Sequence, residues 1–432
     1  MNKTFLDTIK KAHFIGIGGI GVSAVARMML LRSARVTGSD RLTSNITELL
    51  QGLGAHIFTE HKQENLPKDA DIVVYSPAVP ETNPELARAR ELGIPAYSYP
   101  EMLGKISKGM RTIAVAGTHG KTTTTGMIAS VLIDAKKSPT VIVGSLLKSG
   151  SNFIAGTSNL FVVEACEYKR SFLHLSPEIL VITNIDNDHL DYYKDIDDII
   201  SAFHTLAMKV PVHGVIVADT NHEHIKKALH GVSARIMDYC EMEARSEITL
   251  AIPGEHNVRN ACSALAVAQI LDISLEGALI SLAHFQGTWR RQERKGKTTS
   301  GVIVYDDYAH HPTEIRATLQ GFRAKYPESR IRVVFQPHLY SRTRLLMNDF
   351  AESFTDADEV IVAPIYAARE EPEEGITSEK LVEALSLQHN NARYGGDFST
   401  IVSYLRETSK NGDMILTMGA GDIALVGEEF LK

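Results

Sequence analysis

Short apolar runs alternate with longer mixed stretches along most of the chain, which is the pattern of strands connected by helices. The first run covers residues 13–17, a second ends at Asp40 and a third covers 71–75. Later runs cover residues 112–116, 160–163, 179–183, 214–218, 302–305, 331–335, 359–363 and 414–417. Strands that alternate with helix-length segments usually pair in parallel and carry helices on their faces. The pattern therefore predicts an α/β protein.

The runs fall into three groups, each of which has the size of one α/β domain. A chain of 432 residues exceeds what one core usually supports, so several domains are expected. We predict domains at residues 1–107, 108–297 and 298–432. The predicted linkers are 104–109 and 294–300, two polar stretches with glycine, lysine or serine.

Composition narrows the partners that the chain can have. A net charge of −7 gives no basic surface for nucleic acid. The three cysteines, Cys166, Cys240 and Cys262, are too scattered for a disulfide framework and fit a reducing cytoplasm. No apolar stretch is long enough to span a membrane. We expect a cytoplasmic monomer or weak homodimer.

The most informative segment follows the apolar run at 112–116. It breaks at Gly117 and leads into a helix-like stretch through Lys121, with the sequence GTHGKTT. Glycines let backbone N–H groups surround phosphate oxygens, a lysine can reach the terminal phosphates, and the hydroxyl of Thr122 can bind Mg²⁺. The loop is one glycine short of the strict motif, since Val115 occupies that place. The predicted nucleotide loop comprises Gly117, Thr118, His119, Gly120, Lys121, Thr122 and Thr123.

A second glycine motif lies near the N-terminus. Gly16, Gly18 and Gly21 form GxGxxG directly after a predicted strand, and Asp40 follows at the distance of a ribose-binding acid. This pattern favours a dinucleotide such as NAD, and hence a dehydrogenase. A UDP-sugar also carries a diphosphate, so the motif leaves the nucleotide open. Tight packing of Gly21 is a structural alternative.

Acidic and histidine residues gather where two strands of the central group end. Glu164 ends one run, and Asp186, Asp188 and His189 follow another. Oxygen ligands with one imidazole suit Mg²⁺ shared between protein and phosphates. Turn or cap roles remain the alternative for each residue alone. Cys166 has no paired base in the sequence and is not favoured as a nucleophile.

Further on, a helix is predicted at 257–270 with polar residues at its start. Asn257 and Asn260 are three apart and share a face, so their amides can bind an adenine edge, and His256 can stack on the ring. Capping of the helix by Asn257 is the structural alternative, and both can hold together.

The third group ends its strands with charged residues. Asp306 and Asp307 end one run, His310 and His311 follow, and Arg342 comes after the next run. The planar guanidinium of Arg342 matches a carboxylate or a phosphate. A zinc site at the paired histidines lacks further ligand spacing. The basic run at 290–295 is either a solvated linker or a source of phosphate contacts.

Together these motifs resemble the Mur ligases of peptidoglycan synthesis. The resemblance rests on GTHGKTTTT, EACEYKRSFLHL, TNIDNDHLDYY, GEHNVRNA, DDYAHHPTEI and FQPHLYSRT, and it covers essentially the whole chain. It implies a Rossmann-like N-terminal domain that binds a UDP-sugar rather than NAD, a central P-loop ATPase-like domain, and a Rossmann-like C-terminal domain that receives the amino acid. The implied reaction adds L-alanine to UDP-N-acetylmuramate with ATP and Mg²⁺, through an acyl phosphate.

The resemblance also implies roles for individual residues. The implied catalytic residues are Lys121, His189, His311 and Arg342, and the implied metal ligands are Thr122, Glu164 and His189. Outside the loop, the implied ATP contacts are His256, Asn257, Asn260, Arg291 and Asp307. The implied UDP-sugar contacts are Gly16, Gly18, Gly19, Ile20, Gly21, Asp40, Ser76, Pro77 and Ala78.

The chain departs from the family pattern in three places. Cys166 stands where many relatives have aspartate, Leu339 stands where many have arginine, and the stretch 196–208 lacks the lysine that some sister ligases carbamylate. A murein-tripeptide recycling ligase, whose motifs differ at the DDYAHHP and FQPH segments, is the alternative within the family. Outside it, an NAD-dependent dehydrogenase and a nucleotide-dependent binding switch remain rivals.

Overall fold

The computed structural model describes residues 5–147, 151–243, 248–368, 370–389 and 391–432. The chain divides into two compact units. The first contains Met1–Asn187, Tyr192–Glu247 and Ala261–Leu282, and the second contains Asp188–Asp191, Ile248–Asn260 and Ala283–Lys432. Within the described ranges, no helix has both the length and the apolar character that crossing a membrane requires.

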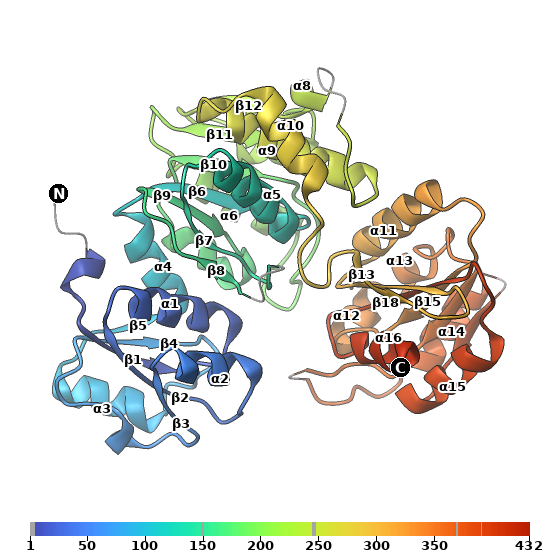
Figure 1. The fold of residues 1–432 in the computed structure, drawn as a ribbon, viewed down its shortest axis with the longest axis horizontal. Helices are drawn as coiled ribbons and strands as arrows, with labels where there is room; N and C mark the ends of the chain where they lie inside the picture. The colour runs from blue at the N-terminus through green and yellow to red at the C-terminus, as the bar shows by residue number, and fades with distance from the viewer. Residues whose placement is uncertain (1–4, 148–150, 244–247, 369, 390) are drawn as a thin grey trace. The chain divides into compact units, whose positions relative to one another are not determined.

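The first sheet is entirely parallel and has the strand order β3-β2-β1-β4-β5 (Figure 1). Alternation along β1 gives it two buried faces, because Phe14 belongs to the core that includes α1 and Ile15 belongs to the core that includes α3. Its strands are β1 Lys11–Ile15, β2 Arg35–Ser39, β3 His56–Phe58, β4 Ile72–Tyr75 and β5 Ala96–Ser98. Its helices are η1 Phe5–Thr8, α1 Ile20–Leu31, α2 Asn45–Gly52, η2 Gln63–Asn65, α3 Pro84–Leu92 and α4 Tyr99–Ser107.

Helices of this region differ in how their N-termini are satisfied. Ser44 and Ser98 form capping boxes on α2 and α4, and the side chain of Asn83 caps α3. By contrast, α1 begins after Gly19, which offers no side-chain cap. The first N–H groups of α1 are therefore available to a ligand.

The second sheet has the order β12-β11-β10-β6-β9-β7-β8 and is parallel except for the β7–β8 pair. Its central strand β6 is buried from its second residue onward, which explains the uninterrupted apolar run in the sequence. The strands are β6 Arg111–Ala116, β7 Thr140–Ile142, β8 Phe153–Ile154, β9 Leu160–Glu164, β10 Ile179–Ile182, β11 Val215–Ala218 and β12 Arg235–Asp238. The helices that follow in sequence are α5 Lys121–Asp134, η3 Tyr168–His174, α6 Ile196–Ala207, α7 Glu223–Ala228, α8 Cys240–Glu243, α9 Glu255–Ile270 and α10 Leu275–His284.

The third sheet has the order β13-β14-β18-β15-β16-β17 and is parallel except for the β13–β14 pair. Its strands bury both faces, since Val333 packs with Leu319 of α11 whereas Val334 packs with Val426 of α16. The strands are β13 Glu293–Lys297, β14 Ile303–Asp307, β15 Ile331–Phe335, β16 Glu359–Val362, β17 Ala392–Tyr394 and β18 Met414–Met418. The helices are α11 Pro312–Lys325, α12 Tyr340–Leu345, α13 Met347–Ala351, α14 Ser378–Ser386, α15 Phe398–Thr408 and α16 Ala424–Leu431.

The α/β class and each strand predicted from an apolar run are confirmed, but both predicted linkers are wrong. The stretch 104–109 begins inside α4, where Leu103, Ile106 and Ser107 are buried, so its first half belongs to a packed helix. The stretch 294–300 begins inside β13, a strand at the edge of its sheet. Edge strands carry polar side chains, which made this one look like a linker.

Candidate active site

The predicted nucleotide loop connects β6 to α5 and depends on two glycines. Gly117 has φ 142°, and a Cβ atom there would lie 2.0 Å from Oγ1 of Thr183. Gly120 has φ 80° and is the N-cap of α5. Both conformations disfavour residues with a side chain, so the loop requires glycine at these two positions.

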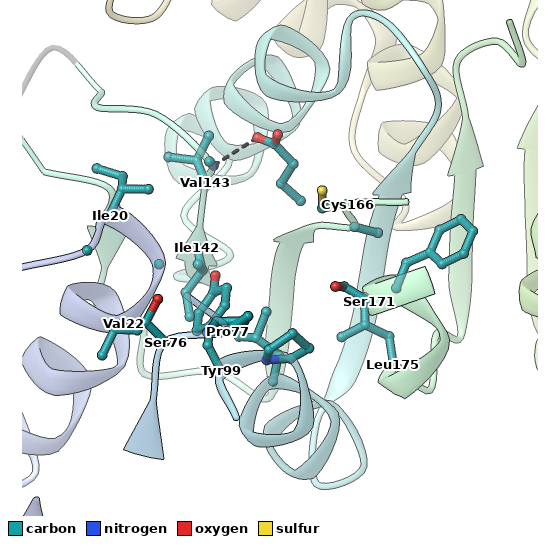
Figure 2. A pocket seen from close by; sticks show the side chains of 18 residues that line it. Ile20, Val22, Ser76, Pro77, Tyr99, Ile142, Val143, Cys166, Ser171 and Leu175 are labelled. Atoms are coloured by element: carbon teal, nitrogen blue, oxygen red, sulfur yellow. Dashed lines mark hydrogen bonds between the residues drawn. The ribbon is translucent and has the colours of Figure 1, made fainter. Parts of the chain in front are cut away.

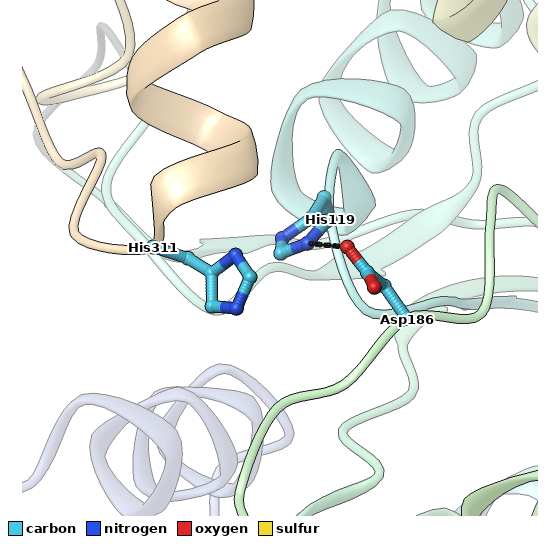
Figure 3. Close-up of side chains that lie close together, drawn as sticks. All are labelled: His119, Asp186 and His311. Carbon is cyan, nitrogen blue, oxygen red and sulfur yellow. Dashed lines mark hydrogen bonds and ion pairs between the residues drawn. The ribbon is translucent and has the colours of Figure 1, made fainter. Parts of the chain in front are cut away.

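The loop is hydrogen-bonded to the segment that follows β10, the neighbour of β6 in the sheet. The backbone nitrogen of His119 donates to Oδ1 of Asn184 at 2.8 Å, and Nδ2 of Asn184 donates to the carbonyl oxygen of His119 at 3.0 Å. The backbone nitrogen of Asp186 donates to Oγ1 of Thr118 at 2.9 Å. Figure 3 shows the imidazole of His119 against the carboxylate of Asp186, with Nε2 and Oδ2 3.2 Å apart. These bonds fix the loop against the segment that follows β10.

The helix that follows the loop is suited to bind an anion. α5 runs for 14 residues, and its N-cap provides no side-chain acceptor for the first N–H groups. These groups and the helix dipole favour a phosphate at this end. Thr122 and Thr123, both predicted to contact ATP, lie in the first turn and are buried.

Lys121 folds back into the loop instead of extending into solvent. Its Nζ donates to the carbonyl oxygens of Gly117 at 2.6 Å and Thr118 at 2.9 Å, and it lies 2.9 Å from Oε2 of Glu167. Burial opposes the charge of the lysine, but Glu167 and its neighbours raise the pKa of Lys121 above its usual value. The ammonium is therefore charged where a phosphate would bind.

Cys166 does not have the properties of a nucleophile. Its side chain is accessible from a cavity, yet the surrounding protein atoms and then the carboxylate of Glu167 raise the pKa of its thiol to about 12. The thiol is thus protonated near neutral pH, and catalysis by sulfur is disfavoured.

Two of the predicted metal ligands belong to the first unit. Glu164 is the last residue of β9, which pairs with β6, and its Oε2 accepts a hydrogen bond from the backbone nitrogen of Gly144 at 2.8 Å. Thr122 supplies a hydroxyl from the start of α5. A carboxylate and a hydroxyl are oxygen donors, as Mg²⁺ prefers, so these residues fit the ion. His189, the third predicted ligand, belongs to the second unit and has φ 54°.

A cavity of about 480 Å³ lies in the first unit between the glycine motif after β1 and the end of β9 (Figure 2). Figure 2 shows Ile20 and Ser76 on one side, and Cys166 and Ser171 on the other. The predicted UDP-sugar residues that line it are Gly19, Ile20, Gly21, Ser76 and Pro77, and Glu164 also lines it. The structure thus brings five residues predicted for the UDP-sugar and one predicted metal ligand, Glu164, to one cavity.

Several residues predicted for the UDP-sugar also have structural contacts within the protein. Gly16 has φ 73°, which favours glycine. A Cβ atom on Gly21 would lie 2.5 Å from the ring of Tyr99, so tight packing accounts for Gly21. The carboxylate of Asp40 accepts a hydrogen bond from the backbone nitrogen of Gly18 at 2.8 Å. Ala78 donates its backbone N–H to Oγ of Ser76 at 3.3 Å.

In the second unit, the start of α9 carries a buried polar cluster. Nδ2 of Asn260 donates to Oδ1 of Asn257 at 3.4 Å, which confirms that the two amides share a face. Asn257 does not cap the helix, because α9 begins at Glu255 and the Asn257 amide donates to the carbonyl oxygen of Pro253 at 2.6 Å. Burial lowers the pKa of His256 to about 4, so its imidazole is neutral and suited to stacking.

Asp307, at the end of β14, is linked to this cluster through Gln292. Its carboxylate accepts from the backbone nitrogens of Gln292 and Ala309, both at 2.7 Å, while the side chain of Gln292 bonds to Asn257 at 3.1 Å. Burial raises the pKa of Asp307 to about 6. Arg291 lies with its guanidinium 5.0 Å from the ring centre of Tyr308.

The basic run at 290–295 is not a solvated linker, because it continues into β13 and begins with a buried arginine. Arg290 is buried, and its guanidinium contacts Oδ2 of Asp306 at 2.7 Å and the carbonyl oxygens of Gly421 and Gly419 at 2.6 and 2.8 Å. It therefore joins the start of β13 to β14 and to the loop after β18, and these partners satisfy its buried charge.

Arg342 lies in α12 and is 9% exposed. Its guanidinium donates to Oδ1 of Asp188 at 2.9 Å and lies 3.0 Å from Nδ1 of His338. Although burial opposes ionisation, Arg342 lowers the pKa of Asp188 well below its usual range. Asp188 thus occupies one N–H of the guanidinium, and the predicted contact with a substrate carboxylate stays a prediction.

The two histidines after β14 have different positions. His311, which is labelled in Figure 3, is the N-cap of α11 and forms a capping box with Glu314. The ring of His310 bonds to the carbonyl oxygen of Tyr308 at 2.9 Å, and burial lowers its pKa to about 3. Both imidazoles are thus tied to local structure.

Sequence reasoning missed two residues that organise these clusters. Glu167 holds Lys121, and Gln292 connects His256, Asn257 and Asp307. Glu167 follows Glu164 by three residues in the same motif, which was a usable signal. Gln292 lay in a run that appeared to be a basic linker and gave no signal of its own.

Three family models match consecutive parts of the chain. The catalytic domain of the Mur ligase family matches residues 11–111, the Mur ligase middle domain matches 115–242, and the Mur ligase glutamate ligase domain matches 290–421. Together they cover more than half of the chain.

Curated relatives match over almost their full length. The UDP-N-acetylmuramate–L-alanine ligase of Clostridium kluyveri is 42% identical over 98% of both chains. The enzyme of the same name from Caldanaerobacter subterraneus is 43% identical over 99% of this chain and 98% of the relative.

Two solved structures cover nearly all of the chain. UDP-N-acetylmuramate-alanine ligase MurC from Thermotoga maritima matches with a TM-score of 0.79 and 29% identity, over 97% of this chain and 98% of that one. A murein peptide ligase from Psychrobacter arcticus matches with a TM-score of 0.68 and 24% identity, over 98% of each chain. At that identity, the second match reports only a shared fold.

Proposed function

This chain belongs to the Mur ligase family, and from that membership we propose that it joins L-alanine to the lactyl carboxylate of UDP-N-acetylmuramate. ATP is cleaved to ADP and phosphate in the reaction. The observation that carries the assignment is the identity of 42% over 98% of both chains with a relative of this activity. The nucleotide loop and the cavity beside it supply the geometry.

The reaction needs ATP because a carboxylate is a poor electrophile. In the proposed sequence, the lactyl carboxylate attacks the γ-phosphorus of ATP, which forms an acyl phosphate and releases ADP. The amine of L-alanine then attacks the acyl carbon, loses a proton and expels phosphate, which leaves an amide. Exclusion of water protects the acyl phosphate from hydrolysis.

The nucleotide loop carries the first step of this proposal. Lys121 and the N–H groups at the start of α5 would bind the β- and γ-phosphates and stabilise the charge that develops on them. Thr122, Glu164 and His189 would hold Mg²⁺, which neutralises phosphate charge when it is bound. His256, Asn257, Asn260, Arg291 and Asp307 are proposed to contact the rest of ATP.

The UDP-sugar is proposed to bind along the cavity that begins at the N-terminal glycine motif. Its diphosphate would bind at the uncapped start of α1, beside Gly19 and Ile20. The cavity continues from there to Glu164, so the acceptor carboxylate would reach the end of β9. Asp40, Ser76, Pro77 and Ala78 complete the proposed contacts with this substrate, together with Gly16, Gly18 and Gly21.

The second unit is proposed to receive L-alanine. Arg342 would bind the amino-acid carboxylate, because a planar guanidinium matches that group and one of its nitrogens already donates to the carboxylate of Asp188. His311 would orient the amine or accept its proton. We place the reaction in the cytoplasm, where ATP is available.

The alternative functions are disfavoured. The murein peptide ligase match is below the identity at which activity transfers, whereas the relatives above 40% identity act on L-alanine. An NAD-dependent dehydrogenase would not need the second glycine loop before α5.

One assay tests the proposed function. Phosphate release from ATP is measured with UDP-N-acetylmuramate and Mg²⁺, with and without each amino acid, and the amide product is identified by mass spectrometry. We expect release that depends on both substrates and is fastest with L-alanine. Release that ignores the amino acid would instead indicate a nucleotide switch, and a change in NADH absorbance without ATP would indicate a dehydrogenase.

A further inference from the structure

We propose that Glu167 is a positioning residue that holds the Lys121 ammonium inside the nucleotide loop and sets how tightly that loop binds phosphate. The inference rests on the proposed function, because it concerns the same phosphate site. It adds a residue to which the motif comparison gave no role.

The contact between the two residues is close and sheltered. Nζ of Lys121 lies 3.0 Å from Oε1 and 2.9 Å from Oε2 of Glu167, so both carboxylate oxygens face the ammonium. The side chains are 13% and 3% exposed, respectively. Such a pair is screened less by salt than a surface pair, so its geometry matters more.

The other partners of Lys121 are carbonyl oxygens of the loop, those of Gly117 and Thr118. An ammonium has three N–H donors, and these partners with Glu167 account for all of them. A phosphate oxygen can therefore bind Lys121 only by replacing one of these acceptors. The carbonyls are neutral, whereas Glu167 is charged, so a carbonyl is the weaker partner to displace.

Glu167 itself is fixed by its backbone. Its carbonyl oxygen accepts from the hydroxyl of the buried Tyr193 at 2.5 Å and from the backbone nitrogen of Arg170 at 2.8 Å. Lys169 and Arg170 have φ 50° and 56°, in the left-handed region that is unfavourable for residues with a side chain. This turn fixes the backbone of Glu167, which restricts the positions that the carboxylate can take when Lys121 changes partners.

A fixed carboxylate beside the phosphate site has two opposite effects. Its negative charge repels the phosphates of a bound nucleotide and weakens binding. It also limits the movement of the Lys121 ammonium, so that this group stays in contact with the reacting phosphate during transfer. Removing the charge should therefore strengthen nucleotide binding and slow turnover, a combination that general damage to the fold would not produce.

The experiment compares Glu167→Gln and Glu167→Asp with the wild-type full chain. Calorimetry gives the Kd for Mg²⁺-ADP, and steady-state assays give kcat. Glu178→Gln is the matched control, because Glu178 is also an ion-paired carboxylate of the first unit, 2.6 Å from Arg111. We expect Glu167→Gln to bind ADP about three- to tenfold more tightly and to lower kcat about tenfold or more. Glu167→Asp should keep the wild-type Kd within about twofold and lower kcat, and the control should match the wild type.

Each outcome bears on the proposal. ADP binding that is unchanged or weaker in Glu167→Gln, with normal binding by the wild type, overturns the role of Glu167 and leaves the ligase activity standing. If Glu167→Gln does not fold, wild-type kcat in Glu167→Asp overturns it. A wild-type chain that does not bind Mg²⁺-ADP would contradict the proposed function itself.

Discussion

Oγ1 of Thr183 lies where a side chain on Gly117 would have to go, only 2.0 Å from the position of its Cβ atom. Thr183 is not free to move away, because its hydroxyl donates to the carbonyl oxygen of His119 at 2.6 Å. The residue after β10 and the turn after β6 therefore pack so closely that a methyl group on Gly117 has no space.

We expect Gly117→Ala to weaken nucleotide binding at least about tenfold and to lower thermal stability, because both φ 142° and the contact with Thr183 oppose it. Gly52→Ala is the control, since Gly52 lies in α2 with open space around its Cβ position. That change should be neutral or raise stability by up to about 1 kcal/mol. Differential scanning fluorimetry with and without ADP separates the effects on stability and on binding. Equal thermal midpoints and equal ADP shifts in the two variants would contradict the close packing of Gly117 against Thr183.

Lys121→Ala should reduce ADP formation by about 10³-fold or more. Lys121 is the only lysine or arginine in the loop at 117–123, so the change would remove the loop's cationic contact with the phosphates. Binding of UDP-N-acetylmuramate should be nearly unchanged, because the glycine motif after β1 would carry it. Lys136→Ala, just after the other end of α5, is the control. Turnover that survives in Lys121→Ala would refute the assignment of the loop.

Arg342→Ala should raise the KM for L-alanine about 10- to 100-fold and leave the KM for ATP within about threefold, because the lost charged contact would affect only the substrate whose carboxylate it binds. Arg344→Ala tests for general damage, as Arg344 lies two residues later in α12 and pairs with Glu373 at 2.8 Å. Initial rates with each substrate varied provide the measurement. A parallel rise in both KM values would argue against a specific contact between Arg342 and the amino-acid carboxylate.

Glu164→Gln should increase the Mg²⁺ concentration needed for half-maximal activity about 10- to 100-fold, because an amide is a weaker ligand than a carboxylate. Titration of activity with Mg²⁺ measures the shift, and chelation by EDTA should abolish wild-type turnover. Glu91→Gln, which changes an exposed partner of Arg88, should leave the Mg²⁺ curve unchanged. An unchanged curve in Glu164→Gln would remove Glu164 from the metal site.

Asp307 predicts a pH dependence of stability. Burial raises its pKa from 3.8 to about 6, so between these values the folded chain holds a proton that the unfolded chain has released. Its contribution to the free energy of unfolding is therefore present below pH 4 and falls as the pH rises to about 6, by roughly 1–3 kcal/mol in all. The thermal midpoint of the wild type minus that of Asp307→Asn should decrease over this window and then level off. A difference that grows with pH would reverse the sign and contradict the shift.

The strands, and the glycine turn between β6 and α5, were predictable because local patterns specify them. The buried run before Gly117 and the turn glycines carry their information within a few residues. Other features depend on partners far along the chain. Nothing near Arg342 indicated that it would meet Asp188, and the polar face of β13 resembled a linker because an edge strand is half exposed. Glu167 was overlooked because its significance comes from Lys121, 46 residues earlier.

The uncapped starts of α1 and α5 have a consequence for the energetics of the whole molecule. Each leaves backbone N–H groups that no side chain at the cap satisfies. Ligands that bind there would supply hydrogen bonds that the polypeptide itself does not provide, and so would stabilise the folded state by mass action. Bound substrates would thus complete the hydrogen bonding of these helix starts. The chain would be most resistant to heat and proteolysis where its substrates are abundant.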